Sequence, residues 1–270
     1  MKNKDLKLTL SEIQSIETDM LRSVIEICDA HQLTYYLVYG SALGAIRHSG
    51  PIPWDSDVDI AILYSDLNRF SALMRKELPE KYYFNFFDND LDYPELLPRI
   101  GMRGYSSKRL HIDVFLLAGA PENVKQQKKF KNQARMLWFL FKFRNFNQRH
   151  FGKFTTLKQK ALVPFVRLTL SVFSRNWIIK RYYELCEKYP LEESKLIANM
   201  NFGYGMKEFI PKTFYREGTK KEYNGFQVNV PEKYDEYLTH IYGDYMKFPK
   251  EEDRRVPEYF IITAMNTDSF

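Results

Sequence analysis

Residues 40–60 read GSALGAIRHSGPIPWDSDVDI, and this stretch decides which fold the chain can adopt. It ends in three carboxylates, Asp55, Asp57 and Asp59, which alternate with other residues and run into an apolar segment. Every second side chain of a strand lies on the same face of a sheet, so we expect these acids to point the same way. Like charges that are buried without a partner are costly. The spacing therefore predicts that a cation neutralises them.

A second strand-like segment, HIDVF at residues 111–115, carries Asp113 between two apolar residues. If the two strands are neighbours, Asp57, Asp59 and Asp113 converge. Such a group suits Mg²⁺ or Mn²⁺, because hard cations bind through a few carboxylates together with substrate phosphates, and two such ions can assist a phosphoryl displacement. A solvated turn is the alternative for an isolated Asp-x-Asp pattern, and the second apolar-flanked acid makes it the weaker interpretation.

A Gly-Ser pair precedes the acids and predicts a phosphate site. Gly40 and Ser41 end the β-prone run TYYLVYG and open a short helix, where backbone N–H groups and a hydroxyl can hold a phosphate. Gly44 permits close approach, and Arg47 lies about one helical turn further on as a phosphate contact. The alternatives are a simple turn for Gly40 and an ordinary surface arginine for Arg47.

The rest of the chain alternates helical and strand-like segments. Apolar residues recur at helical spacing from Ser11, which resembles a cap, to Ala30. Further helices are expected at residues 41–48 and 67–78, with strands at 34–40, 57–63, 82–87, 96–104 and 110–119. Basic helical segments follow, and a short strand and a helix lie near residues 222–249. This order predicts an α+β fold with an added helical layer.

Composition excludes several protein classes. The chain has 270 residues, of which 44% are hydrophobic and 27% charged, as in globular proteins. Its N-terminus has no apolar run of signal-peptide length, and no window is long and apolar enough for a transmembrane helix. Cys28 and Cys186 lack metal-ligand spacing, so we expect buried thiols in a reducing cytoplasm.

The positive charge is concentrated in one segment. Residues 123–183 contain 15 Lys and Arg and no Asp or Glu, with many aromatic residues among them. Such a segment can bind nucleic acid, bind an anionic membrane or cover the core with a solvated face. Ordinary surface helices mix charge signs, and the apolar runs MLWFLF and ALVPFVRLTLSVF are too hydrophobic for a duplex-reading face. Membrane contact is therefore favoured, and no nucleic-acid partner is expected.

The Gly-Ser pair, the Asp-x-Asp strand and the later Asp are similar to the polymerase β-like nucleotidyltransferase superfamily. Residues 40–60 resemble the LicD family, whose motif reads close to G-x-L-L-G-A-x-R-H-x-G-x-I-P-W-D-x-D-x-D. The segment VPEKYDEYLTHIYGDYMKFP, residues 230–249, resembles the closing motif of that family. Ser41 and Ser56 depart from the common residues, as does the tail VPEYFIITAMNTDSF. The basic middle segment is not well covered by the resemblance.

The resemblance implies a nucleotidyltransferase-like mixed sheet flanked by helices. Its divisions would be a catalytic core at residues 1–120, a basic aromatic helical insertion at 121–200 and a C-terminal α/β segment at 201–270. Asp57, Asp59 and Asp113 would be catalytic metal ligands. Substrate contacts would come from six further residues: Gly40, Ser41, Gly44, Arg47, His48 and Asp55. His48 could also pack in the turn, Trp54 is expected in the core, and His111 is a weaker candidate for proton transfer.

The implied activity is transfer of phosphocholine, or a similar phosphoryl alcohol, from a CDP-alcohol donor to a sugar hydroxyl with release of CMP. The acceptor would be a lipopolysaccharide, capsule or teichoic acid precursor, lipid-linked at the inner face of the cell membrane, where a cytoplasmic enzyme would bind peripherally. Two alternatives stay open: a nucleotidyltransferase that moves NMP to a small molecule or RNA, and a non-catalytic membrane-associated scaffold. Retention of the costly acids argues against the scaffold.

Overall fold

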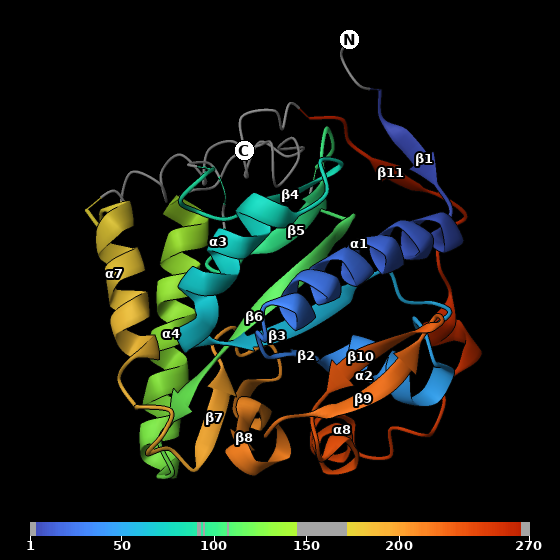
Figure 1. Cartoon of the computed structure of the whole chain (residues 1–270). Coiled ribbons are helices and arrows are strands. Elements are labelled where there is room, and N and C mark those ends of the chain that lie inside the picture. Colours follow the sequence, from blue (N-terminus) through green and yellow to red (C-terminus); the bar gives the residue numbers. More distant parts are fainter. Residues whose placement is uncertain (1–3, 91–92, 94, 107, 145–171, 266–270) are drawn as a thin grey trace.

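The computed structural model describes residues 4–90, 93, 95–106, 108–144 and 172–265 (Figure 1). Its centre is a mixed sheet of seven described strands, in which β3 (Val58–Leu63) and β6 (His111–Ala120) are parallel neighbours. The other strands pair antiparallel around them: β2 (Tyr35–Leu37), β4 (Tyr82–Asn85), β5 (Arg99–Met102), β7 (Leu196–Asn199) and β8 (Phe209–Pro211).

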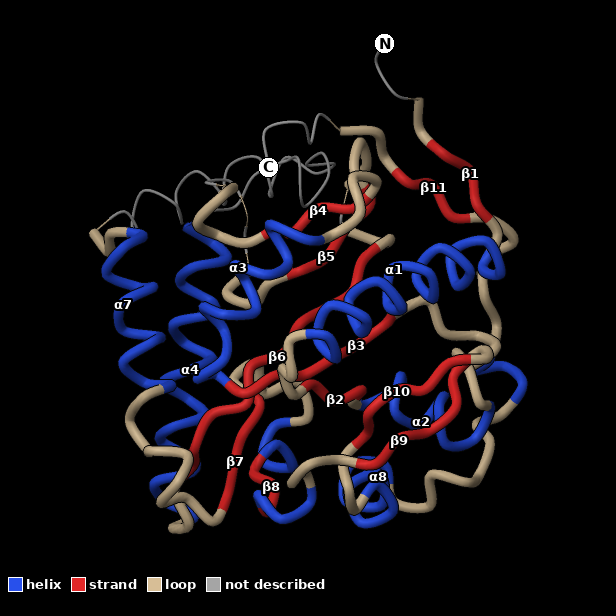
Figure 2. Tube along the Cα trace, in the orientation of Figure 1, coloured by secondary structure: helices blue, strands red, loops and turns tan. Residues whose placement is uncertain are grey.

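Helices surround this sheet. In the view of Figure 2, α1 (Leu10–Ala30) and α3 (Leu67–Glu77) cross in front of it, whereas α4 (Val124–Arg144) and α7 (Arg175–Cys186) pack against each other at one side. The helix α2 (Tyr39–His48) contacts α8 (Tyr234–Tyr242). Short 3-10 helices are Tyr64–Asp66, Gly205–Glu208, Lys212–Phe214 and Glu251–Arg254. Helices and a mixed sheet give the α+β class that the sequence predicts.

The first helix begins one residue earlier than expected, and its cap is Thr9 rather than Ser11. The Thr9 hydroxyl accepts the N–H of Glu12, and the Glu12 carboxylate accepts the N–H of Thr9, which completes a capping box. Ser11 is followed at the same spacing by Gln14. That side chain instead donates to the carbonyls of Ile52 and Asp55, so it holds the loop before β3.

The strand that carries the acids starts later than the alternation suggests. β3 begins at Val58, so Asp55 and Asp57 belong to the preceding loop, and only Asp59 lies in the strand. Pro51 and Pro53 cannot donate to a sheet ladder, and the N–H of Asp55 closes a turn onto the carbonyl of Ile52. The apolar residues behind Asp59 are buried as predicted: Val58, Ile60 and Ile62.

Two strand pairs lie outside the central sheet. β1 (Leu6–Leu8) pairs with β11 (Phe260–Ile262), which brings distant parts of the chain together above α1 in Figure 1. β9 (Thr219–Tyr223) and β10 (Phe226–Val230) form a hairpin whose turn residues, Asn224 and Gly225, both have positive φ, as a tight turn of this kind requires. The Asn224 N–H donates to the Ser49 carbonyl, which fastens this hairpin to the end of α2.

The stretch predicted as a basic insertion contributes more than helices. From within residues 121–200, β7 pairs with β6 in the central sheet. The proposed division into segments stays a prediction, and its middle part, residues 145–171, lies outside the described residues. Cys28 and Cys186 are buried free thiols, as expected. Within the described ranges, no helix combines the length and apolarity needed to cross a membrane.

Candidate active site

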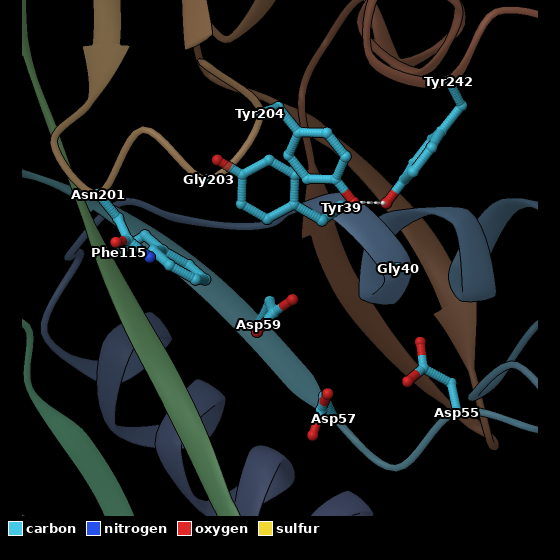
Figure 3. A pocket seen from close by; sticks show the side chains of 10 residues that line it. All are labelled: Tyr39, Gly40, Asp55, Asp57, Asp59, Phe115, Asn201, Gly203, Tyr204 and Tyr242. Atoms are coloured by element: carbon cyan, nitrogen blue, oxygen red, sulfur yellow. Dashed lines mark hydrogen bonds between the residues drawn. The ribbon is translucent and has the colours of Figure 1, made fainter. Parts of the chain in front are cut away.

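Asp55, Asp57 and Asp59 line one pocket of about 230 Å³. Figure 3 shows Asp59 on β3, Asp57 just before it and Asp55 on the loop facing the start of α2. The remaining lining is mostly aromatic: Tyr39, Gly40, Phe115, Asn201, Gly203, Tyr204 and Tyr242. None of these lining residues is a lysine, arginine or histidine. The pocket therefore concentrates negative charge next to aromatic rings.

The electrostatics of the pocket are those of a site for a cation. Burial and the nearby carboxylates Asp113, Asp57 and Asp55 raise the pKa of Asp59 well above its usual range. Burial and the charge of Asp57 likewise raise the pKa of Asp55. A bound cation would remove this repulsion, and carboxylate oxygens are the ligands that Mg²⁺ and Mn²⁺ prefer. The donor set thus fits a hard divalent ion.

Asp113 is beside Asp59 but already has a counter-ion. The two residues are paired in the β3–β6 register, as the sequence predicts. Arg99 lies opposite on β5, and its Nε donates to Asp113 Oδ1 at 2.5 Å, while His111 Nε2 is 3.4 Å from the same oxygen. Burial alone would raise the pKa of Asp113, but Arg99 and His111 hold it well below the usual range. Asp113 is not among the residues that line the pocket.

This arrangement bears on how a metal could be held. Across the described part of the chain, no three His, Cys, Asp or Glu side chains are grouped closely enough to hold an ion by themselves. An ion in the pocket would therefore also need oxygens from substrate or water, as is usual for Mg²⁺. Arg99 was missed by the sequence analysis. The run LLPRIGMRG predicted a strand at this position but gave no sign that Arg99 would pair with Asp113.

The start of α2 is built around the acids. An added Cβ on Gly40 would lie 2.7 Å from Asp55 Oδ2, so the absence of a side chain lets this carboxylate approach the helix N-terminus, where negative charge is favourable. The buried hydroxyl of Ser41 accepts the N–H of Asp59 at 2.8 Å, which ties α2 to β3. A Cβ on Gly44 would lie 2.5 Å from the Gly50 carbonyl, so Gly44 gives close approach to the chain's own turn.

Arg47 and His48 lie at the other end of α2, outside the lining of the acidic pocket. Arg47 Nη1 donates to the carbonyl of Tyr245 at 2.8 Å, so the structure connects the two motifs that the sequence analysis singled out. Arg47 Nε donates to His48 Nε2 at 3.0 Å. Trp54 is partly buried and packs against the main core, as expected, and it lies close to Arg47.

The aromatic wall was not predicted. The rings of Tyr39 and Tyr204 stack with centroids 5.0 Å apart, and the hydroxyls of Tyr204 and Tyr242 are hydrogen-bonded at 3.0 Å (Figure 3). Phe115 packs edge-on against Tyr39. Tyr242 stands in the closing motif and Tyr39 precedes the Gly-Ser pair, which were usable signals. Nothing in the segment NFGYG marked Tyr204.

A buried polar network holds Tyr39 in place. Its hydroxyl donates to Glu208 Oε2 at 2.6 Å and accepts from Asn199 Nδ2 at 2.6 Å. Glu208 Oε1 accepts the N–H of Tyr204 at 2.9 Å. Burial, opposed by these hydrogen bonds, raises the pKa of Glu208 to about 7. Tyr39 has φ +50°, an unfavourable conformation for a bulky residue, and this network stabilises it.

Another buried acid lies behind the pocket. Glu17 of α1 is buried, and its Oε1 accepts the N–H of His111 at 3.4 Å. Burial and the charge of Asp57 raise the pKa of Glu17 well above its usual range. The helical pattern alone placed position 17 among polar residues and gave no sign that it would be buried.

Comparison with known proteins agrees with this geometry. Residues 32–172 match the family model described as LicD/FKTN/FKRP, nucleotidyltransferase domain. The chain belongs to this LicD family. The lipopolysaccharide cholinephosphotransferase LicD of Haemophilus influenzae is 29% identical over 260 residues, which cover 92% of this chain and 96% of that protein. The human ribitol 5-phosphate transferase FKRP is 41% identical over 56 residues, which cover 21% of this chain and 11% of FKRP.

An uncharacterised protein of Rickettsia typhi, RT0683, is 33% identical over 55 residues, covering 20% of this chain and 18% of that one. The family resemblance stated from the two motifs is thus confirmed, and the LicD-family match makes the chain a phosphotransferase. The structure brings the sequence motifs together. The acids, the Gly-Ser pair and the closing motif lie on or next to β3, α2 and α8, and each contributes residues to one pocket or its edge.

Proposed function

We propose that this LicD-family protein transfers phosphocholine, or a similar phosphoryl alcohol, from a CDP-activated donor to a sugar hydroxyl of a surface-glycan precursor, such as lipopolysaccharide or teichoic acid. The observation that carries the proposal is a pocket in which three carboxylates adjoin an aromatic wall. The near full-length similarity to a lipopolysaccharide cholinephosphotransferase supports the choice of phosphocholine.

Asp57 and Asp59, with Asp55 nearby, would hold one or two Mg²⁺ or Mn²⁺ ions. When bound, such an ion would neutralise the diphosphate of the donor and favour displacement at phosphorus. The charge of these carboxylates restricts how the donor can bind. Their uncompensated charge repels a bare diphosphate, so the pocket admits this group only together with cations.

The aromatic wall supports a choline group over a polyol. A quaternary ammonium ion binds favourably to the faces of aromatic rings, and Tyr204, which is 41% exposed, presents its ring beside Tyr242. Neighbouring carboxylates add attraction for the same cation. Ribitol and glycerol carry no charge and would gain much less from this wall.

The chemistry needs one proton acceptor. The oxygen of the sugar hydroxyl attacks the phosphorus that carries choline, the bond from that phosphorus to the bridging oxygen breaks, and CMP departs with the electron pair. The hydroxyl proton passes to a carboxylate, and Asp113 lies beside Asp59 in the β3–β6 register. Its ion pair with Arg99 keeps Asp113 ionised, which makes it a weak base, and its position beside Asp59 keeps it near the reaction.

We also propose that α4 and α7 bring the enzyme to an anionic membrane surface. One exposed stripe of α4 carries cations and then apolar side chains: Lys125, Lys128, Lys129, Arg135, Met136 and Phe139. The start of α7 adds the exposed Trp177 and lies beside the end of α4 (Figure 1). Basic residues next to exposed aromatic ones are typical of interfacial helices. The enzyme would bind a lipid-linked acceptor at that surface.

A donor screen tests the proposed activity. We expect release of CMP, with modification of a glycan acceptor, from CDP-choline in preference to CDP-ethanolamine, CDP-glycerol and CDP-ribitol, in the presence of Mg²⁺ or Mn²⁺. Mass spectrometry follows both products. Asp59→Asn should lower turnover by about 100-fold or more, since it removes charge where the donor is held. Glu26→Gln, an exposed position on α1, is the matched control.

Full turnover in Asp59→Asn would contradict the assigned site. The second candidate is a nucleotidyltransferase, which the description of the matching family model favours. That reaction would transfer NMP from a nucleoside triphosphate and release pyrophosphate, so detection of pyrophosphate with CTP instead of CMP with CDP-choline separates the two.

A further inference from the structure

Two arginines lie against Trp54, outside the acidic pocket. Arg47 ends α2, and Arg254 belongs to the 3-10 helix Glu251–Arg254. Their guanidinium carbons are 5.9 and 5.3 Å from the centroid of the Trp54 ring. Figure 1 shows the red segment after α8 passing α2 on its way to β11, which brings these distant parts of the sequence together.

Neither arginine has a carboxylate partner among the described residues. Arg47 is half-buried and its hydrogen bonds go to neutral acceptors, the carbonyl of Tyr245 and the ring of His48. Burial lowers the pKa of Arg47, whereas Arg99, on β5, is paired with Asp113. Arg254 Nε is buried without any hydrogen-bond partner. Buried polar groups are rarely left in this state.

The rings around these groups restrict how they can bind. The Arg47 guanidinium lies 4.6 Å from the centroid of Phe248, which is 50% exposed, and His48 packs edge-on against both Trp54 and Phe248. A guanidinium stacked on an aromatic ring keeps the N–H groups at its edge available. Such a planar set of donors matches the oxygens of a phosphate.

Two short connections along the chain join the arginines to the acidic pocket. Trp54 immediately precedes Asp55, which lines that pocket. Tyr242 also lines it, and three residues later the carbonyl of Tyr245 accepts from Arg47. A region that requires a cation therefore lies next to one that has two cations without counter-ions.

We propose that Arg47 and Arg254, placed around Trp54, form a phosphate-binding subsite at the edge of the acidic pocket. Arg254 is the new element, because neither sequence motif includes it. The occupant is a phosphate group. Naming it as the phosphate of CMP rests on the proposed function, whereas the subsite itself rests on the unpaired arginines.

The test compares ligands that differ only in the phosphate. We expect Arg254→Gln to weaken binding of CMP about tenfold, as loss of one charge-assisted contact predicts, and to leave the weaker binding of cytidine unchanged. Arg255→Gln removes the same charge from the adjacent, exposed position and should change neither. Calorimetry measures the affinities, and the melting temperature of each variant checks its fold.

A purely structural role for Arg254 predicts something different, namely equal losses for CMP and cytidine, and that result would overturn the subsite. Equal effects of Arg254→Gln and Arg255→Gln on CMP would do the same. Arg47→Gln should lose CMP affinity as well, and Arg47→Lys should regain part of it because the charge returns.

Failure of the donor assignment is distinguishable. If wild-type protein ignores CMP, the same variants are tested with inorganic pyrophosphate and with vesicles containing phosphatidic acid. Tenfold weaker binding of pyrophosphate by Arg254→Gln than by Arg255→Gln supports the subsite without the CDP donor. A loss confined to the vesicles assigns the phosphate to a lipid. Wild-type protein that binds none of these probes overturns the proposal.

Discussion

Asp59 and Asp113 face each other across the β3–β6 pair, yet their charges are compensated differently. Asp59 lines a pocket whose walls supply no cation, whereas Asp113 is held by Arg99. The pKa of Asp59 is raised and that of Asp113 is lowered, so folding opposes ionisation of the first and favours ionisation of the second. At neutral pH the first charge reduces the free energy of unfolding, and the second increases it.

We therefore predict stability effects of opposite sign for two chemically identical changes. Without divalent metal, Asp59→Asn should raise the free energy of unfolding, because it removes a repelled charge. Asp113→Asn should lower it by about 3 kcal/mol, because it removes the carboxylate that forms an ion pair with the buried Arg99. Urea unfolding at pH 7 in the presence of a chelator measures both. Changes of the same sign would show that the two carboxylates share one environment.

Single residues were predictable where a pattern marked them. The alternation of acids and apolar residues identified Asp57, Asp59 and Asp113, and the pocket contains the first two. Arg99 was not predictable as a partner, because its position follows from the pairing of β5 with β6, which one sequence does not specify. The same holds for Tyr204, whose neighbours in space are far away in sequence.

Elements followed the same rule. The helix at residues 10–30 and the strands β3 and β6 repeat apolar residues with a clear period and were predicted within one or two residues. β1, β8 and β11 have three residues each, too few to show a period. β1 and β11 form because they pair with each other across the sequence, and β8 forms because it pairs with β7. β3 begins one residue later than predicted, at Val58, and the alternation of acids starts in the loop before it.

Glu208 connects its own 3-10 helix to α2 and β7. Its carboxylate accepts a hydrogen bond from the Tyr39 hydroxyl at the start of α2, and that hydroxyl accepts one from Asn199 of β7. Its pKa is about 7 in the folded protein, against 4.5 ordinarily. The folded state therefore binds more protons between these values, and the contribution of Glu208 to stability is fully present below pH 4.5 and lost as the pH rises through 7.

We predict that the free energy of unfolding of the wild type falls by about 2.5 kcal/mol between pH 5 and pH 8 through this group alone. Glu208→Gln keeps an acceptor for the Tyr39 hydroxyl but has no proton to lose. Its free energy of unfolding should therefore increase relative to that of the wild type as the pH rises. Urea unfolding across this range tests it, with Glu26→Gln as an exposed control. Parallel pH curves for Glu208→Gln and the wild type would refute the assignment.

The whole molecule carries a net charge of +6, and residues 123–183, which include α4 and the first part of α7, hold 15 Lys and Arg without any Asp or Glu. Replacing Lys125, Lys128 and Lys129 by Glu should weaken binding to anionic vesicles by on the order of 100-fold at low salt, since each lysine near such a surface contributes about 1 kcal/mol. Replacing Met136 and Phe139 by Ser should weaken the binding that survives at high salt. Sedimentation with vesicles measures both.

The matched control reverses three exposed lysines on other elements, Lys76, Lys108 and Lys250, which changes the net charge equally. Equal losses in the two triple variants would mean that overall charge, rather than the α4 surface, drives binding. If the α4 variant sediments with vesicles as the wild type does, the proposed binding of α4 to a membrane is wrong.

The pocket is lined by residues that lie far apart in the sequence, from Tyr39 to Tyr242. A ribosome adds about 5–20 residues per second, so the acids emerge many seconds before Tyr204 and Tyr242 are translated. Until then the nascent chain has the carboxylates, Tyr39 and Phe115 but lacks Tyr204 and Tyr242, and it has no Arg254 to place beside Trp54. An mRNA truncated before the codons for α8 would therefore yield a product that keeps Asp55, Asp57 and Asp59 but lacks Tyr242, and we expect this product to be inactive.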